Sequence, residues 1–463
     1  MTQSICSGLS TFVCTILDDL NRLIGPVHLV GEVLRRCLTG DDPPEDLDLL
    51  VSMPLTECRQ RLLKAGYETV VMGKKHNSLL VPLKRNDRPR TIEISTFRFR
   101  PDHEPTIEEA LRHRDVTANA IAYLWSDGPL IDPFHGLRDL YSKQIRLVQG
   151  EATIREDPLR ALTLFRYALN LGGVPDELHL AQAEAVDATD LATDRLRAEL
   201  DQMLSLPLEN DRDRALITRL FNAPLGRTML PEIAALQTIT CPSNKDTAWQ
   251  RTIKTMLAIT PPGENERISM LDLRWGAMLH AIGRSNQGAC DHDEIGGRTK
   301  PCRELTMRIG VGLLDRLQFS NRRKQRVISL IQHLDVPLSP SERTLRRLIK
   351  KNIPLEALFR LLKAMQDAVP DRSDKKKKES DEEFERVMRR CKTLRSSDEQ
   401  LRPRDLALSG GEILDIVRRS PGPWLGKLQQ TLINWVAEDP WRNNPGQLKG
   451  RIDEWIVSDE AEF

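Results

Sequence analysis

Hydrophobic and polar positions follow two different periods along this chain. Over residues 1–150, short apolar runs alternate with turn residues, which is typical of a domain that mixes strands and helices. From Glu156 onward, apolar residues recur at helical spacing, interrupted by clusters of proline and glycine. The pattern predicts an α/β head with a mixed sheet and helices, followed by an all-α remainder.

The same periodicity locates individual elements in the head. It predicts strands over residues 27–31, 47–51, 69–72, 79–83, 91–96 and 130–132. Thr106 with Glu109 three residues later is the signature of a capping box, so we expect a helix that begins there and carries Arg112 to Asp115. Farther along, four consecutive lysines at 375–378 indicate an exposed linker or a helix extension.

Length and composition narrow the class of protein. The chain has 463 residues, 40% of them hydrophobic and 29% charged, as expected for a globular protein with about two to four domains. Its formal net charge is +1, so binding to nucleic acid would depend on local basic patches. Eight cysteines without a CxxC pair suggest reduced thiols, and no apolar run approaches the roughly 20 residues that span a bilayer. Because the N-terminus also lacks the basic region of a signal peptide, we expect a cytoplasmic protein.

The strongest local signal is a set of three carboxylates. Asp46 and Asp48 alternate with leucines on a predicted strand and so share one face, and Glu93 lies between apolar neighbours on a second strand. Adjacent carboxylates repel one another unless a cation lies between them, and hard oxygen ligands suit Mg²⁺. Three such groups can hold two metal ions for an in-line phosphoryl displacement. Taken by itself, Asp-x-Asp is more often the polar face of an exposed strand.

A second signal, Asp157 and Arg160, lies at the start of the helical region. Pro158 suits the first turn of a helix, and from such a turn both side chains would extend from one face. The carboxylate can accept from an exocyclic amine while the guanidinium donates to a ring nitrogen, which matches the Watson–Crick edges of cytosine and adenine and rejects those of uracil and guanine. The alternative is structural, with Asp157 as an N-cap in a first-turn ion pair.

These signals belong to a longer series of motifs. Gly31 after a strand, followed by Asp46-x-Asp48, resembles the signature of the DNA polymerase beta-like nucleotidyltransferases. Residues 112–123, 132–140 and 156–160 resemble further segments of the bacterial tRNA nucleotidyltransferase and poly(A) polymerase family, the class II CCA-adding enzymes, in the same order. Four ordered matches over roughly 130 residues are far more specific than any one of them.

The resemblance implies a division into four domains. Residues 1–150 would form a head of the nucleotidyltransferase fold and residues 151–215 a helical neck that carries the base-reading helix. Residues 216–350 would form a helical, degenerate HD-like body, and residues 351–463 a helical tail that binds RNA.

The resemblance also implies roles for individual residues. The catalytic residues and metal ligands would be Asp46, Asp48 and Glu93, with Mg²⁺ as the cofactor. The nucleotide-binding residues would be Gly31, Arg35, Arg114, Asp115, Asn119, Asp157 and Arg160. For Arg114 and Asp115, a buried ion pair that holds the head together is an alternative of equal weight.

The chain departs from the family pattern at four places. Glu32 stands where a small residue is expected after Gly31, and Arg36 replaces an aspartate. His113 replaces the first arginine of Arg-Arg-Asp. The stretch 98–112, where family members usually have a flexible loop, is short and resembles members that add only part of the CCA end. Which nucleotides are added is therefore left open.

The helical half retains traces of further family motifs. His280 is followed by Ala281 where an HD-type domain has its metal-binding His-Asp pair, so we expect a structural relic with His280 as a core histidine. The cysteine, histidine and two aspartates at 290–293 could ligate a metal, but their Gly-rich surroundings favour a solvated loop. Residues 401–406 and 420–426 resemble the tail of tRNA-end-adding enzymes. A strip that could face RNA, or could equally be solvated helix surface, consists of Arg343, Arg346, Arg347, Lys350 and Lys351.

Together these features predict a Mg²⁺-dependent, template-independent RNA nucleotidyltransferase. It would add C, A or both from CTP and ATP to an RNA 3′ end, with tRNA as the expected RNA. One alternative is a poly(A) polymerase of the same family, and another is a catalytically impaired RNA-binding relic, which Glu32 and Arg36 suggest. An HD phosphohydrolase is the weakest alternative because His280 lacks its aspartate. We expect no membrane association, and the sequence indicates no protein partner.

Overall fold

The structure of the chain is a computed structural model. It describes residues 9–42, 44, 46–72, 78–83, 90–97, 105–126, 128–208, 210–240, 246–262, 269–285, 300–351, 353–369, 374–398 and 402–457. The chain divides into two compact units, residues 1–230 and 231–463.

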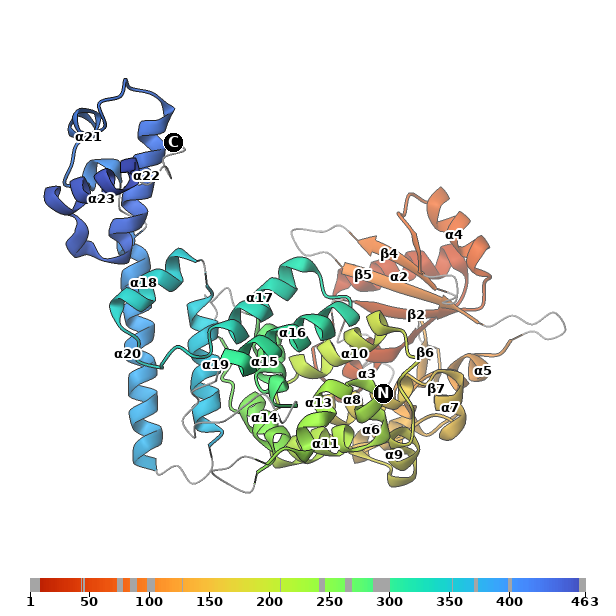
Figure 1. Cartoon of the computed structure of the whole chain (residues 1–463). Helices are drawn as coiled ribbons and strands as arrows, with labels where there is room; N and C mark the ends of the chain where they lie inside the picture. Colours follow the sequence, from red (N-terminus) through yellow and green to blue (C-terminus); the bar gives the residue numbers. More distant parts are fainter. Residues whose placement is uncertain are drawn as a thin grey trace. The chain divides into compact units, whose positions relative to one another are not determined.

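A seven-stranded mixed sheet forms the centre of the first unit (Figure 1). The strands are β1 (Val27–Val30), β2 (Leu47–Val51), β3 (Val70–Met72), β4 (Ser78–Leu83), β5 (Arg90–Thr96), β6 (Ala122–Leu124) and β7 (Leu130–Ile131). Their order across the sheet is β3-β4-β5-β2-β1-β6-β7, with β2 and β5 parallel and the other neighbouring pairs antiparallel. All six predicted strands are confirmed. β6 is an additional strand, which the pattern does not predict because it lies within a continuous apolar run, 120–125, with no alternation.

The two faces of this sheet differ in character. Leu47 and Leu49 of β2 and Ile92 and Ile94 of β5 point into the main core of the head. That core is closed by α2 (Thr11–Ile24), α3 (Gly31–Thr39) and α4 (Leu55–Lys64), and Figure 1 shows α2 and α4 beside the strands. The intervening residues of β2 and β5 therefore face the opposite side, where the polar residues of both strands come together.

Short helices connect the sheet to a helical region within the same unit. They are α5 (Ile107–Arg112), η1 (Thr117–Asn119), α6 (Gly136–Ser142), α7 (Glu151–Glu156), α8 (Arg160–Asn170), α9 (Glu177–Glu184), α10 (Thr193–Ser205), α11 (Asp211–Asn222) and α12 (Pro224–Met229). A two-stranded sheet of β8 (Gln144–Ile145) and β9 (Val174–Pro175) accompanies them. The capping box of Thr106 and Glu109 is confirmed at the start of α5.

Two helix predictions in this region need correction. α5 ends at Arg112, so Arg114 and Asp115 lie beyond the helix that was expected to carry them. The helix that was expected to have Pro158 in its first turn begins two residues later, at Arg160, and Asp157 lies before it with an extended backbone. Pro158 belongs to the turn before α8, where the Arg160 N–H donates to the Asp157 carbonyl at 3.0 Å.

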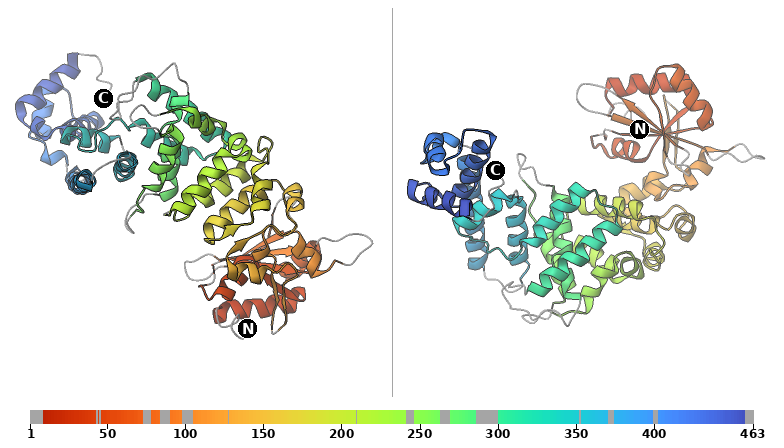
Figure 2. Two further views of the ribbon diagram at one scale, coloured as in Figure 1. Left: turned by 90° about the horizontal axis from the view of Figure 1, so that it is seen from below. Right: turned by 45° about the horizontal axis from the view of Figure 1, so that its top comes forward.

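The described part of the second unit is helical (Figure 2), apart from an isolated bridge between Thr240 and Thr247. Its α-helices are α13 (Pro231–Ala234), α14 (Ala248–Leu257), α15 (Met270–Leu279), α16 (Lys300–Arg316), α17 (Asn321–Gln332), α18 (Glu342–Lys350), α19 (Leu355–Asp367), α20 (Asp374–Asp398), α21 (Gly410–Val417), α22 (Pro423–Glu438) and α23 (Pro445–Val457). The lysines at 375–378 lie in α20, as a helix extension. Residues 406–455 contribute a separate small core around α22. In the described ranges, no helix combines the length and the apolar composition that crossing a membrane requires.

Candidate active site

Asp48 and Glu93 lie side by side on the polar face of the head sheet. They are register partners on the parallel strands β2 and β5. Burial raises the pKa of the Asp48 carboxyl above its usual range; Arg114 opposes this shift, while the carboxylates of Glu93 and Glu32 add to it. Two neighbouring carboxylates repel each other, so a cation between them is favoured.

Gly31 makes room for the Asp48 side chain. The backbone of Gly31 has a φ of +68°, and a Cβ built there would lie 2.2 Å from Asp48 Oδ2. The next N–H along the chain, that of Glu32, donates to the Asp48 carboxylate. Only glycine fits this turn, because any side chain would collide with the carboxylate and strain the backbone.

Two of the departures from the family pattern form an ion pair with each other. The Glu32 carboxylate lies 3.5 Å from the Arg36 guanidinium, one turn along α3, and both side chains are exposed. An exposed ion pair of this kind contributes little to stability. The pair places a positive charge beside Glu32, although the Glu32 carboxylate still adds to the raised pKa of Asp48.

Asp46 is engaged differently from its neighbours. It is exposed and precedes β2, and its Oδ1 accepts hydrogen bonds from the backbone N–H of Thr91, at 3.2 Å, and from the Thr91 hydroxyl. Among the described residues, no three His, Cys, Asp or Glu side chains lie close enough together to hold a metal ion. The structure thus brings Asp48 and Glu93 together, whereas the Asp46 side chain is hydrogen-bonded to Thr91 near the start of β5.

A buried polar network lies behind the acidic pair. The guanidinium of Arg35 donates to Asn119 Oδ1, and Asn119 Nδ2 donates to Asp115 Oδ1 at 2.9 Å. Arg35 and Asn119 are each 4% exposed. The network continues to Tyr167 of α8, whose ring centre lies 5.5 Å from the Arg35 guanidinium and whose hydroxyl is hydrogen-bonded with Asn119. The predicted residues Arg35, Asp115 and Asn119 are therefore brought together, but their side chains are hydrogen-bonded to one another.

Arg114 does not join that network. The Asp115 carboxylate is taken by Asn119 and by the backbone N–H of Val116 at 2.8 Å, and no ion pair joins it to Arg114 in the part of the chain described here. Arg114 instead lines a pocket that also contains Glu93. The alternative of a buried Arg114–Asp115 pair is therefore wrong.

That pocket is lined by residues of the sheet and of the helices that follow it. It encloses about 370 Å³. Its lining includes His113 and the charged residues Glu93, Arg114, Asp115, Asp157, Arg160, Arg166, Arg195 and Glu199. The acidic face of the sheet and the two predicted base-reading residues thus border one cavity.

Asp157 and Arg160 have separate partners. The Asp157 carboxylate accepts from the Arg195 guanidinium at 2.6 Å. Arg160 donates to Glu156 at 2.8 Å and to the backbone carbonyl of His113. The structural alternative combined an N-cap with a first-turn ion pair. The Asp157 carboxylate does accept from the backbone N–H of Leu159 at 3.3 Å, as an N-cap would, but among the described residues no ion pair joins Asp157 to Arg160.

His113, the third departure, belongs to the same network. Its Nδ1 lies 2.9 Å from a Glu156 oxygen, and its carbonyl accepts from Arg160. Substitution of the family arginine therefore falls on a residue that is itself one partner of Arg160 and lies against the other, Glu156.

Sequence reasoning missed the contribution of α8 and α10 to this pocket. Arg166 of α8 donates to Glu199 of α10 at 2.6 Å and lies over the Tyr167 ring, 4.3 Å from its centre. Arg195 and Glu199 are four residues apart, a spacing that places both on one helical face. That spacing of opposite charges could have identified α10 as a polar, site-facing helix.

The predictions for the second unit have mixed outcomes. His280 is 6% exposed and its Nδ1 lies 2.6 Å from the Ala277 carbonyl, which confirms a core histidine. In the basic strip, Arg346 is buried and donates to Glu342 at 2.9 Å, so it does not face RNA, whereas the other four residues are exposed. The predicted solvated loop at 290–293 lies outside the described residues, as do residues 98–104 of the shortened stretch.

Comparison with known proteins places these features in a family. Residues 27–146 match the family model "Poly A polymerase head domain". The chain is 28% identical over 270 residues to the multifunctional CCA protein of Pseudomonas fluorescens (strain SBW25), covering 56% of this chain and 63% of that protein. It is 30% identical over 288 residues to the CCA-adding enzyme of Blochmanniella pennsylvanica (strain BPEN), covering 58% of this chain and 67% of that protein. The chain thus spans 62–63% of the length of the multifunctional CCA proteins that it matches.

Solved structures share the fold over nearly the whole chain. The Bacillus stearothermophilus CCA-adding enzyme in complex with CTP superposes with a TM-score of 0.60 at 20% identity, over 97% of this chain and 98% of that one. The Thermotoga maritima CCA-adding enzyme complexed with tRNA gives 0.56 at 17% identity, over 98% of each chain. With the acidic sheet face, the pocket and the curated relatives, this fold shows that the chain belongs to the tRNA nucleotidyltransferase and poly(A) polymerase family.

Proposed function

We propose that this chain is a template-independent RNA nucleotidyltransferase that acts in the cytoplasm. It adds C, A or both from CTP and ATP to an RNA 3′ end, with tRNA as the RNA. The observation that carries the proposal is the single cavity bordered by Glu93 of the acidic pair and by Asp157 and Arg160. Family membership supports it, as do the related structures solved with CTP, ATP and tRNA.

Asp48 and Glu93 are the residues that would hold a divalent cation. Their carboxylates are hard oxygen donors on neighbouring strands, and Gly31 leaves room for the Asp48 carboxylate, so the donor set fits Mg²⁺. Bound there, Mg²⁺ would acidify the RNA 3′-hydroxyl and neutralise charge on the leaving diphosphate. Asp46 would join as a third ligand by exchanging its hydrogen bonds with Thr91 for the metal.

Asp157 and Arg160 would read the edge of the incoming base. A carboxylate has about four acceptor sites and a guanidinium five N–H donors, so each residue can keep its present partner and still bind a base. Arg195 and Glu156 would then fix their orientation. The free acceptor of Asp157 suits the amine of cytosine or adenine, and the free donors of Arg160 suit the neighbouring ring nitrogen.

Arg114 would offset the charge of the triphosphate. It lines the pocket with Glu93 and acts electrostatically on Asp48. A guanidinium beside the metal site can donate to phosphate oxygens in a bidentate manner.

The test is incorporation of labelled CTP or ATP into tRNA shortened stepwise at its 3′ end. Asp48→Asn and Glu93→Gln, and removal of divalent ions with a chelator, should each lower incorporation by about a thousandfold or more, the range for loss of a main electrostatic contribution. Asp42→Asn is the matched control, because Asp42 is an exposed carboxylate of the same head. Unchanged incorporation by the Asp48 and Glu93 variants would place the reaction elsewhere.

The same assay distinguishes the alternatives. Asp157→Asn and Arg160→Ala should reduce the preference for CTP and ATP over UTP and GTP while the RNA still binds. Open-ended addition of A to unrelated RNAs would identify a poly(A) polymerase. Binding of tRNA without incorporation of any nucleotide would identify an RNA-binding relic.

A further inference from the structure

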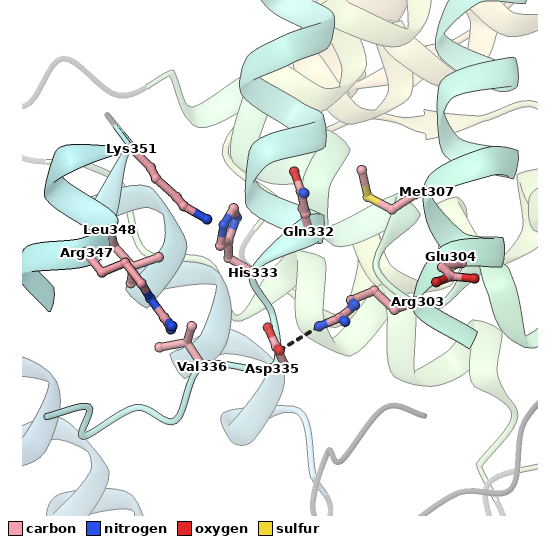
Figure 3. A pocket seen from close by; sticks show the side chains of 10 residues that line it. All are labelled: Arg303, Glu304, Met307, Gln332, His333, Asp335, Val336, Arg347, Leu348 and Lys351. Carbon is pink, nitrogen blue, oxygen red and sulfur yellow. Dashed lines mark hydrogen bonds and ion pairs between the residues drawn. The ribbon is translucent and has the colours of Figure 1, made fainter. Parts of the chain in front are cut away.

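A second pocket lies entirely within the second unit (Figure 3). It encloses about 600 Å³ between α16, the C-terminal end of α17 and α18. In Figure 3, Arg347 and Lys351 lie on the α18 side and Arg303 and Met307 on the α16 side, with His333 between them. None of these residues belongs to the candidate active site.

Some basic residues of α18 and its C-cap have hydrogen-bond partners, whereas others face the pocket without an ion pair to a described residue. Arg346 donates to Glu342 at 2.9 Å, and Lys350 donates to the Asn434 carbonyl of α22 at 3.4 Å. Arg347 and Lys351, one turn apart, both line the pocket and are exposed, and no ion pair joins either of them to another described residue. Two neighbouring cations without counter-charges attract an anion.

The rest of the polar lining does not neutralise this pair. The Asp335 carboxylate is taken by Arg303, at 2.7 Å. His333 Nδ1 lies 2.9 Å from the Ser329 carbonyl, which can only accept, so Nδ1 carries a hydrogen and Nε2 is left for a ligand. Glu304 is exposed at the α16 side and is the other acid of the lining.

An apolar surface lies beside the cations. Met307 and Val336 are half-buried pocket residues and form this surface, whereas Leu348 is 1% exposed and is already covered by protein. Inorganic phosphate would use only the cations, whereas an organic phosphate would also cover this apolar surface. The volume lies within the roughly 300–1,000 Å³ typical of small-molecule sites.

We propose that this pocket binds a free phosphorylated molecule of nucleotide size. Its phosphate would lie between Arg347 and Lys351 and near His333, and its ring would pack on Met307 and Val336. This site is separate from the pocket of the proposed reaction and does not depend on that reaction being correct.

The experiment is calorimetric titration of the full chain with AMP, adenosine and inorganic phosphate. AMP should bind, and adenosine and phosphate should each bind about tenfold more weakly, since each lacks one half of the recognition. Arg347→Glu with Lys351→Glu should weaken AMP binding by about a hundredfold, and the milder Arg347→Gln with Lys351→Gln by about tenfold. The control, Arg322→Glu with Arg343→Glu, changes the net charge equally at exposed sites outside the lining and should leave binding unchanged.

A variant of the candidate active site distinguishes AMP binding at this second pocket from AMP binding at the first. AMP binding should survive in Asp157→Asn with Arg160→Ala. Loss of AMP binding in that variant, or equal affinity in the wild type and both α18 double variants, overturns the proposal. Failure of AMP to bind, with tRNA binding reduced in the Arg347 and Lys351 variants, also overturns it and identifies an RNA-facing surface instead. Thermal melting of each variant confirms that it is folded.

Discussion

At the scale of single residues, Gly31 provides the space that the Asp48 carboxylate of the acidic pair occupies. Its φ of +68° and the closeness of Asp48 both exclude a side chain. Gly31→Ala should therefore displace the Asp48 carboxylate, lower the free energy of unfolding by more than about 2 kcal/mol and abolish nucleotide incorporation. Urea unfolding and the incorporation assay measure the two effects.

Gly40 provides the matched control for that substitution. It also has a positive φ, +78°, at the other end of α3, but a Cβ there would meet nothing within 4 Å. Gly40→Ala should cost only about 1 kcal/mol of backbone strain and leave incorporation intact. Equal behaviour of the two variants would show that contact with Asp48 is unimportant.

Residue types and spacing predicted part of the site. Alternation along strands was enough to place Asp48 and Glu93 on one face, because both lie inside regular strands. It did not anticipate that Asp46 would bond to Thr91, because Asp46 precedes β2 and its side chain is not constrained by the pleat. Arg195 was missed because its partner, Asp157, lies on a segment distant in sequence.

At the scale of elements, one histidine joins α9 to the chain that follows β8. His179 Nδ1 accepts from the Leu147 N–H at 3.1 Å, which requires this nitrogen to be unprotonated. Burial lowers the pKa of His179 below its ordinary value of 6.5; Asp176 opposes the shift and Arg146 adds to it. The unfolded chain therefore takes up the proton first, and the contribution of this contact is present above pH 6.5 and is lost as the pH falls through the lowered pKa.

Two substitutions separate the hydrogen bond from the titration. His179→Asn places an acceptor oxygen close to the position of Nδ1 and should retain most stability at pH 7 while weakening the pH dependence below 6.5. His179→Ala leaves the buried Leu147 N–H without an acceptor and should cost about 1–3 kcal/mol at pH 7. Urea unfolding between pH 5 and 8 measures both. An unaltered pH dependence in both variants would assign the titration to another group.

Element boundaries were predicted best where local chemistry determines them. Thr106 and Glu109 start α5 through a local hydrogen-bonded box, so a short sequence was sufficient. The break between α7 and α8 is also local, because the residue before a proline is driven away from helical backbone and Asp157, which precedes Pro158, is extended. What the local sequence could not give is the partner of Asp157, since Arg195 of α10 lies far away along the chain.

At the scale of the whole chain, the division at residue 230 can be tested by truncation. Every residue of the candidate active site lies before it. We expect residues 1–230 to unfold cooperatively and to bind CTP or ATP, whereas residues 1–215, which end at the predicted neck boundary, should be much less stable. The shorter fragment cuts α11 and removes α12, which packs against α9.

The buried side chains of α11 and α12 give the size of that difference. The shorter fragment lacks Leu220, Leu225, Met229 and Leu230, each less than 1% exposed. At about 1.5 kcal/mol or more for each, the loss is about 6 kcal/mol, comparable with the whole stability of many domains. Circular dichroism during urea unfolding compares the fragments. Equal midpoints would show that the compact unit ends earlier than residue 230.

The parallel pairing of β2 with β5 has a consequence for synthesis of the chain. β2 leaves the ribosome before α4, β3 and β4 have been made, and only afterwards does β5 emerge to pair with it. A nascent polypeptide that stops before β5 therefore lacks Glu93, the partner of Asp48 in the acidic pair, and one that stops before Arg195 lacks a side of the cavity. Prematurely terminated products would accordingly be unable to consume nucleoside triphosphates, however well their early helices had formed.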